Sequence, residues 1–289
     1  MCEYIQQYST VSTFISSESW VILSPIEQSI KRKIEAVGKP LKDWDIQINY
    51  GIKTGCNEAF IIDEAKRVEI LFNCQSEDER KRTEEIIRPI LRGKDIKRYS
   101  YVDSGKYLIN THNGIKEKGI PPIDILDYPA IKNHLDSFGD VLVRRSDQGN
   151  TPYNLRNCAY LEDFSKPKIM WKRIGSILRF CYNENGALGL DSTCFAAGKG
   201  AEFLCCLLNS PMGHYLLKDS PKTGTGDLLI SIQAVEPIKV PPITETLMRS
   251  FRALLTNICQ IGGTEEEQET SINHQIFSLY NLSEEEQEY

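Results

Sequence analysis

The chain has 289 residues, of which 40% are hydrophobic and 26% charged, a composition typical of a globular protein with one large domain or two small ones. Its net charge of −6, taken as a single number, disfavours nucleic acid as a partner. The apolar runs are too interrupted to cross a membrane, and no basic start followed by an apolar block marks a secretory signal, so we expect no membrane partner.

The nine cysteines form no Cys-x-x-Cys pair, and several lie inside apolar runs, as reduced core thiols do. A disulfide scaffold or a zinc site would need regular spacings, which are absent. We therefore expect a cytoplasmic protein without a bound metal.

The acidic residues are unevenly placed. From Ala253 onward there are eight glutamates and no lysine or arginine, and without those eight, 34 basic residues stand against 32 acidic ones. The basic residues of the body gather in short clusters, at 31–33, 80–82, 92–98, 144–145 and 166–173. Such clusters bind phosphate when they share one face of a fold, and they also occur as solvated helix faces, so charge alone leaves both interpretations open.

The first elements are marked by clear boundaries. Residues 1–19 show no period and are interpreted as an arm or linker. Ser24-Pro25-Ile26-Glu27 is typical of a helix start, and Gly38 predicts the end of that helix near Val37. The apolar pattern then predicts, in order, strands at 46–50 and 59–63, a charged helix at 77–87, a strand at 106–110 and a helix at 130–138.

The second half has shorter elements. The pattern predicts a hairpin of 168–174 with 177–182, a strand at 194–197, helices at 201–208 and 212–218, short strands at 230–232 and 238–240, and helices at 245–261 and 265–280 separated by Gly262-Gly263. Short strands in mixed order with single helices between them predict an α+β fold of mixed short-strand sheets, followed by a helical C-terminal extension. We divide the chain into an arm (1–19), a body (20–243) and an extension with an acidic tail (244–289).

The sequence offers little support for catalysis. The glycine-rich stretches 198–200 and 222–226 lack the spacing of a phosphate-cradling loop and are interpreted as turns. The four histidines lie in dissimilar contexts, and no aspartate pair is followed by the Glu-x-Lys of a magnesium nuclease. We expect no catalytic and no metal-binding residue in this chain.

Several stretches, taken in order, match one known family. They are 51–62, preceded by the helix within 20–38; 87–99 (IRPILRGKDIKRY), followed by 106–109; 153–156 through 164–171 to 207–210; and the tail 272–286. This ordered set resembles the TaqI-like C-terminal specificity domain of type IIG restriction–modification enzymes and related adenine-N6 DNA methyltransferases, from about Trp20 to the end of the chain.

The resemblance implies a target-recognition domain in the body, with double-stranded DNA as its partner. In the family, a transferase half lies upstream, with an S-adenosylmethionine loop and an Asn-Pro-Pro-Tyr-type motif that positions a flipped adenine. Here the nearest string is Asn150-Thr151-Pro152-Tyr153, which lacks the tandem proline. We therefore expect no cofactor in this chain and S-adenosylmethionine on an associated methyltransferase or endonuclease module, in cis or in trans.

The expected DNA contacts lie on the stretches that match the family. Five cations fall within eleven residues and suit phosphate contacts: Arg88, Arg92, Lys94, Lys97 and Arg98. On the strand near 166–173, alternation places Lys168, Met170 and Lys172 on one face and Ile169, Trp171 and Arg173 on the other, with Trp171 expected in the core. Lys172 or Arg173 is a candidate for a guanine edge.

Two loops complete the expected contacts. In 51–57, Lys53, Thr54 and Asn57 suit phosphate or a base edge, although a plain hairpin turn explains this loop equally well. Lys222, in a loop with two glycines, suits a DNA-gripping role and equally an ordinary exposed loop.

The C-terminal helices carry apolar residues at helical spacing, which fits a helical hairpin packed on the body or a docking surface for a methyltransferase partner. The acidic tail disfavours DNA contact there. As the alternative to DNA recognition we keep a protein-docking subunit, derived from a specificity domain, that no longer reads DNA. An intact small enzyme ranks last.

Overall fold

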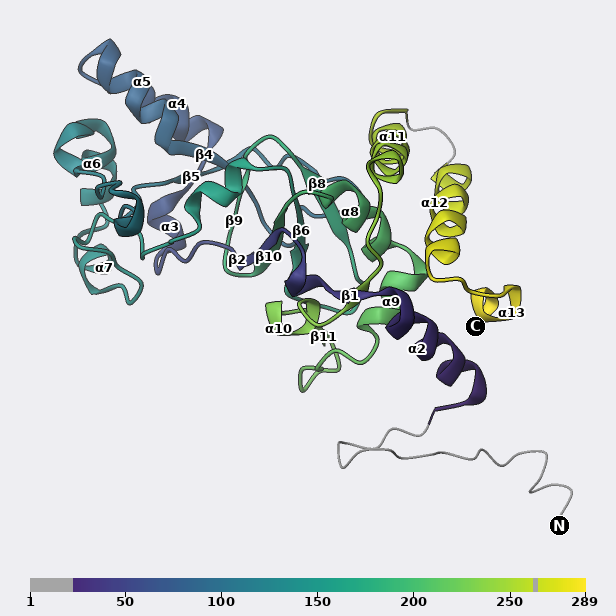
Figure 1. Cartoon of the computed structure of the whole chain (residues 1–289). Coiled ribbons are helices and arrows are strands. Elements are labelled where there is room, and N and C mark those ends of the chain that lie inside the picture. Colours follow the sequence, from purple (N-terminus) through teal and green to yellow (C-terminus); the bar gives the residue numbers. More distant parts are fainter. Residues whose placement is uncertain (1–22, 262–264) are drawn as a thin grey trace, which may run out of the picture.

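The computed structural model describes residues 23–261 and 265–289. The predicted arm at 1–19 and the predicted break at Gly262-Gly263 lie outside the described residues. Within the described part the chain forms an α+β fold, as the sequence predicts, with small sheets at its centre and helices at both ends (Figure 1).

The central sheet has the strand order β2-β10-β6-β8, and each neighbouring pair is antiparallel. Its strands are β2 (Ile46–Tyr50), β10 (Thr193–Gly198), β6 (Lys168–Lys172) and β8 (Phe180–Asn183). The predicted hairpin is confirmed by the pairing of β6 with β8. Because side chains alternate along a strand, Ile169 and Trp171 pack in one core while Met170 packs in the other, so β6 is covered on both faces.

A second sheet has the order β3-β5-β4-β9. Its strands are β3 (Ile61–Asp63), β5 (Lys106–Ile109), β4 (Ile87–Leu91) and β9 (Leu188–Gly189). The sequence predicts a helix at 77–87 and no strand directly after it, whereas the structure continues from Ile87 as β4. Pro89 is tolerated because β4 has a strand partner on one side only at this residue. Strand β5 pairs there, whereas β9 joins on the other side at Ile90 and Leu91.

Short helices surround the second sheet. They are α3 (Asn57–Phe60), α4 (Glu64–Phe72), α5 (Glu77–Ile86), α6 (Pro129–Asp136) and α7 (Gly139–Arg144), with 3-10 turns at Lys116–Lys118 and Ile125–Asp127. The strand predicted at 59–63 begins only at Ile61 in the structure, because Asn57–Phe60 forms a helical turn. The prediction did not include α4, α7 or β9.

The opposite end of the molecule is built by a second set of helices. They are α2 (Pro25–Val37), α8 (Ala201–Asn209), α9 (Pro211–Leu217), α11 (Glu245–Ile261), α12 (Glu265–Leu279) and α13 (Glu284–Glu288). Ser24 caps α2 by accepting from the Glu27 amide, and the Glu27 carboxylate accepts from the Ser24 amide, which is the predicted capping box.

The remaining elements connect these parts. They are β1 (Lys39–Pro40) paired with β12 (Lys239–Val240), β7 (Ile174–Gly175) paired with β11 (Leu228–Leu229), α10 (Ile232–Val235), and 3-10 turns at Leu41–Asp43 and Leu161–Ser165. The strand predicted at 230–232 is wrong. Ser231 precedes the helix α10, and the carbonyl of Ile230 accepts a hydrogen bond from the Trp171 indole instead of a strand partner.

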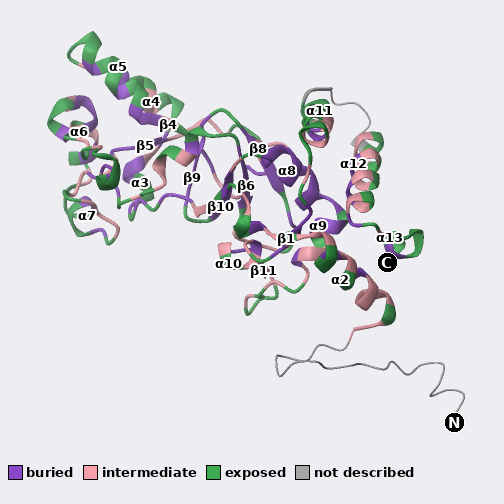
Figure 2. Ribbon diagram, viewed as in Figure 1, coloured by how far each residue is buried: buried purple, intermediate pink, exposed green. Residues whose placement is uncertain are grey.

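Helix α8 is the centre of the larger core. All nine of its residues are buried, which fits its apolar sequence and its place between the central sheet and α11 (Figure 2). Phe251 of α11 and Ile276 of α12 belong to the same core as Ile30 of α2. The C-terminal extension therefore packs on the body through a shared core.

Candidate nucleic-acid interface

Four strand ends meet at one edge of the central sheet. The pairing register places Tyr50, Cys194, Trp171 and Phe180 side by side across β2, β10, β6 and β8. Because β2 and β6 run toward this edge while β10 and β8 start from it, the loops beyond these residues leave the sheet together. They carry Lys53, Asp191, Lys172 with Arg173, and Arg179.

A first hollow opens at this edge between β6 and the segment 92–97. It has a volume of about 300 Å³ and is lined by Lys94, Lys172 and Arg179, among others. A Cβ on Gly93 would stand 2.7 Å from Cγ of Lys172, so only glycine lets this segment lie against the lysine stem. The structure thereby brings Lys94 and Lys172, two residues predicted from separate stretches, into one site.

A second hollow lies at the same edge between β2 and β6, with a volume of about 390 Å³. Lys53 and Arg173 line it, together with Arg156, Tyr50 and the carboxylate of Asp191. The guanidinium carbon of Arg173 lies 5.8 Å from the centre of the Tyr50 ring, which orients the side chain by a cation–π contact.

Several cations of this edge have no internal partner. Among the described residues, no ion pair and no side-chain hydrogen bond joins Lys53, Lys94, Lys97, Lys172, Arg173, Arg179 or Lys222 to another residue. We call the five cations that line the two hollows, Lys53, Lys94, Lys172, Arg173 and Arg179, together with Lys97, which directly follows Ile96 of the first hollow, the cationic edge. A cation without an internal carboxylate keeps its charge available to an external anion such as a phosphate.

Lys222 lies in a neighbouring loop. Lys222 forms a β-bridge with Leu228 of β11. Strand β11 in turn pairs with β7, which begins directly after Arg173. The loop therefore emerges beside the cationic edge, and its lysine is exposed.

Three of the predicted arginines are engaged inside the protein. Arg92 makes two hydrogen bonds to the carboxylate of Asp95, at 2.9 and 3.1 Å. Arg98 pairs with Glu269 of α12 at 2.8 Å and donates to the carbonyl of Asn209. Arg88 donates to the carbonyl of Gly186, and burial lowers the pKa of its guanidinium. These three side chains hold loops and the extension in place.

The expectation that Lys168 contacts DNA is incompatible with its position. Its side chain is fully buried, and its ammonium group donates to the carbonyl of Phe164 at 2.6 Å and to Oδ1 of Asn183 at 2.8 Å. Burial lowers the pKa of this lysine to about 7. The alternation predicted for β6 is correct, but both faces of this strand are covered. The pattern of apolar and polar residues along the strand does not reveal that the second face is covered.

The loop after β2 is shaped from within. Thr54 is buried, and its hydroxyl lies 2.7 Å from Oδ1 of Asn57 and also accepts from the amide of Cys56, as in a local turn. Of the three residues predicted in this loop, Lys53 is the one that lines the second hollow. Asn57 is exposed at the start of α3.

Arg145 organises the neighbouring loops, a role that no pattern in the sequence indicates. Its buried guanidinium donates to the carbonyls of Thr54, Asp147, Pro152 and Asn154. One side chain thereby fixes the loop that carries Lys53 and the segment that leads to Arg156. Arg156 and Arg179 were also missed: Arg156 lies on the matching stretch 153–156 but outside the basic clusters, and Arg179 lies outside the matching stretches.

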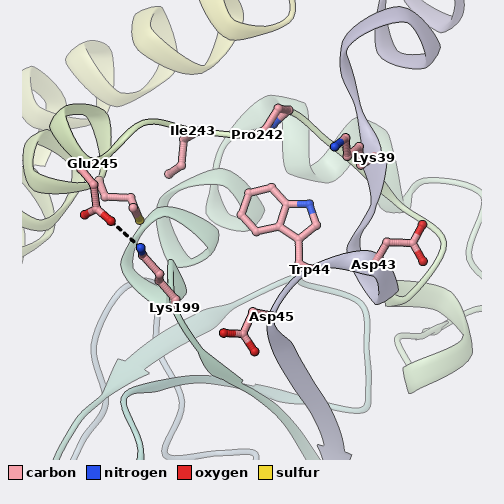
Figure 3. Close-up of a pocket in the computed structure, with 9 residues that line it drawn as sticks. Lys39, Asp43, Trp44, Asp45, Lys199, Pro242, Ile243 and Glu245 are labelled. Carbon is pink, nitrogen blue, oxygen red and sulfur yellow. Dashed lines mark hydrogen bonds and ion pairs between the residues drawn. The ribbon is translucent and has the colours of Figure 1, made fainter.

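A further hollow, of about 340 Å³, lies where α11 meets the start of β2, far from the loops of the cationic edge. Figure 3 shows Trp44 pointing toward Pro242 and Ile243, and Lys199 paired with Glu245. Acidic side chains outnumber basic ones here, since Asp43, Asp45 and Glu245 line the hollow together with Lys39 and Lys199. This site lacks the excess of positive charge that marks the cationic edge.

Within residues 23–261 and 265–289, no group of three or more His, Cys, Asp or Glu side chains is arranged to hold a metal ion. No helix there is both long and apolar enough to cross a membrane.

Comparison with known proteins identifies the family of this chain. The family model of the TaqI-like C-terminal specificity domain matches residues 88–234, half of the chain, and the chain therefore belongs to this family. The type IIL restriction-modification enzyme MmeI, solved in complex with DNA, matches with a TM-score of 0.58 and 10% identity over 86% of this chain and 34% of its own. The type IIG restriction endonuclease BpuSI matches with a TM-score of 0.44 and 13% identity over 88% and 32%. No curated protein matches the sequence.

These findings confirm the family that the sequence resembles. At 10% identity the likeness to MmeI concerns the fold. The chain spans about a third of the length of MmeI and of BpuSI.

Proposed function

We propose that this chain recognises a sequence in double-stranded DNA for a restriction–modification system, and that its cationic edge lies on the DNA. The observation that carries the proposal is the gathering of unpaired cations at one sheet edge, in a member of a family of specificity domains. The four edge lysines neutralise phosphates and fix the position of the domain on the duplex, while the loops between them face the grooves.

The charge distribution supports this placement. The eight glutamates that follow Ala253 lie on the C-terminal extension. Two of them form ion pairs, Glu269 with Arg98 and Glu286 with Lys33. The extension therefore lies away from phosphate, and the net charge of −6 is compatible with a DNA-binding edge.

The chemistry that uses this recognition belongs, in the same proposal, to another module. A methyltransferase or endonuclease module in cis or in trans would bind S-adenosylmethionine and methylate adenine at N6, with or without cleavage. The supporting observation is that this chain spans about a third of the length of MmeI. Calorimetric titration of the chain with S-adenosylmethionine tests the division, because binding to this chain alone would contradict it.

Enrichment from a pool of random-sequence duplexes tests the recognition itself. The purified chain is mixed with the pool at low salt, bound duplexes are recovered and sequenced, and the cycle is repeated. A specificity domain enriches a defined motif. Binding without enrichment would contradict sequence recognition, and absence of binding even at low salt would favour the alternative, a docking subunit that no longer reads DNA.

A further inference from the structure

Arg173 differs from the other cations of the edge in how firmly it is placed. Its amide donates to the carbonyl of Ser192, and its carbonyl accepts from the amide of Ile230, so the backbone is held on both sides. The guanidinium lies over Tyr50, whose hydroxyl donates to Oε1 of Gln233 at 3.0 Å. A guanidinium on a fixed ring loses less conformational entropy on binding than a free lysine does.

The same guanidinium lacks hydrogen-bond partners. Its Nε is buried and makes no hydrogen bond among the described residues. Asp191 lines the same hollow, yet no ion pair joins it to Arg173. Arg92 and Arg98, by contrast, each have a carboxylate partner. A buried donor without an acceptor is costly, and an external acceptor that enters the hollow offsets this cost.

The position of Arg173 along the edge also matters. In the order β2-β10-β6-β8, Lys53 follows β2 on one flank, while Arg179 and Lys94 lie at β8 on the other. Three strand spacings separate β2 from β8, roughly 14 Å, which is close to the major-groove width of roughly 12 Å. Cations on the two flanks are therefore spaced to meet the two phosphate backbones, and Arg173 lies between them.

We propose, resting on the function proposed above, that Arg173 determines specificity by reading a guanine in the major groove. The planar guanidinium fork presents two parallel donors, and guanine presents two acceptors, O6 and N7, on its major-groove edge. Lys172, the residue directly before Arg173 and the last of β6, has a single ammonium group, lines the other hollow and contacts a phosphate.

The test compares variants of the full chain by enrichment from the same random-sequence duplex pool. The variants are Arg173→Ala, Arg173→Lys and, as the matched neighbour, Lys172→Ala. The wild type is expected to enrich a motif with an invariant guanine. Both Arg173 variants lose the preference at that single position and keep the others, because lysine does not reproduce the fork. Lys172→Ala keeps the whole motif at weaker affinity.

A second measurement leaves the protein intact. Replacing the invariant guanine by 7-deazaguanine removes the N7 acceptor, which should weaken wild-type binding on the order of ten-fold and leave Arg173→Ala unaffected. The inference is overturned if Arg173→Ala retains the complete motif, if the wild-type motif contains no guanine, or if deazaguanine weakens both proteins equally. A wild type that enriches no motif at all overturns the proposed function, and this inference with it, so the two failures are distinguishable.

Discussion

Arg144 and Arg145 are adjacent in the chain and differ completely in their surroundings. Arg144 lies at the end of α7 with 80% of its side chain exposed, paired with Asp140, whereas Arg145 is 6% exposed and donates to four backbone carbonyls. The sequence presents them as one basic cluster. Burial and hydrogen bonding, which the sequence does not encode locally, make the second one a structural residue.

Replacing Arg145 by Ala should therefore lower the free energy of unfolding by roughly 3 kcal/mol or more, because it leaves buried carbonyls without donors. Arg144→Ala is the matched control and should change it by less than roughly 0.5 kcal/mol. Urea unfolding followed by circular dichroism measures both. Equal effects of the two variants would contradict the role assigned to Arg145.

Lys168 makes stability depend on pH. Burial lowers the pKa of its amine from 10.5 to about 7. From about pH 7 to about pH 8.5 the unfolded chain keeps a proton that the folded chain releases, so the free energy of unfolding rises with pH, by at most roughly 1.4 kcal/mol per pH unit.

Lys168→Met should remove this rise, whereas Lys166→Met, at an exposed lysine paired with Asp163, should keep it. Urea unfolding of the three proteins across that pH range gives the slopes. If wild type and Lys168→Met show the same slope, the ammonium is not desolvated as described.

At the scale of elements, the long and strongly patterned segments follow from the sequence. Helices α2, α5, α8, α11 and α12 and strands β2, β5, β6 and β10 lie where periodicity and caps predict them. Most short elements do not, because two-residue strands such as β9 exist only through partners distant in the chain, although β12 lies within the strand predicted at 238–240. Strand β4 was missed because Pro89 normally ends a strand or helix, and only the pairing on one side makes it compatible.

The candidate site, too, follows only in part from the sequence. The sequence predicts that 92–98 and 166–173 are cationic, but it does not reveal which cations are already paired. The partner of Arg98 is Glu269, 171 residues further along, whereas Lys94 and Lys172 meet only because Gly93 lies against the lysine stem. Long-range packing therefore decides which side chains remain available to DNA.

An ion pair joins helix α13 to helix α2. Lys33 lies 2.5 Å from the carboxylate of Glu286, a residue that is 8% exposed. Burial opposes ionisation of this carboxylate, but Lys33 and the Ser283 amide lower its pKa from 4.5 to about 2. A carboxylate with a lowered pKa contributes stability above about pH 4.5, and this contribution is lost as the pH falls toward 2.

Glu286→Gln should therefore unfold at a lower temperature than the wild type at pH 6, and the difference should shrink at about pH 3. Glu285→Gln, at an exposed position beside it, should match the wild type at both pH values. Thermal unfolding followed by circular dichroism compares the three proteins. A difference between wild type and Glu286→Gln that stays constant between the two pH values would show that the ion pair is not responsible.

At the scale of the whole molecule, charge is separated along the chain and in space. The extension carries the excess of glutamates and shares a core with α2 and α8, while the unpaired cations gather at one edge of the central sheet. Many other surface lysines are neutralised by a neighbouring carboxylate. This separation makes a DNA-binding edge compatible with a protein of net charge −6.

The most direct measurement is the salt dependence of binding to random-sequence duplex DNA for two variants of equal charge. One changes Lys53, Lys94, Lys97 and Lys172 of the cationic edge to Ala. The other changes four ion-paired lysines elsewhere: Lys66, Lys118, Lys132 and Lys199.

If the edge lies on DNA, the first variant loses roughly one unit of slope in log affinity against log salt for each lysine removed, because each releases about one counterion, and the control keeps a slope near that of the wild type. Equal loss in both variants would mean that binding follows net charge alone and would contradict the placement of the cationic edge on DNA.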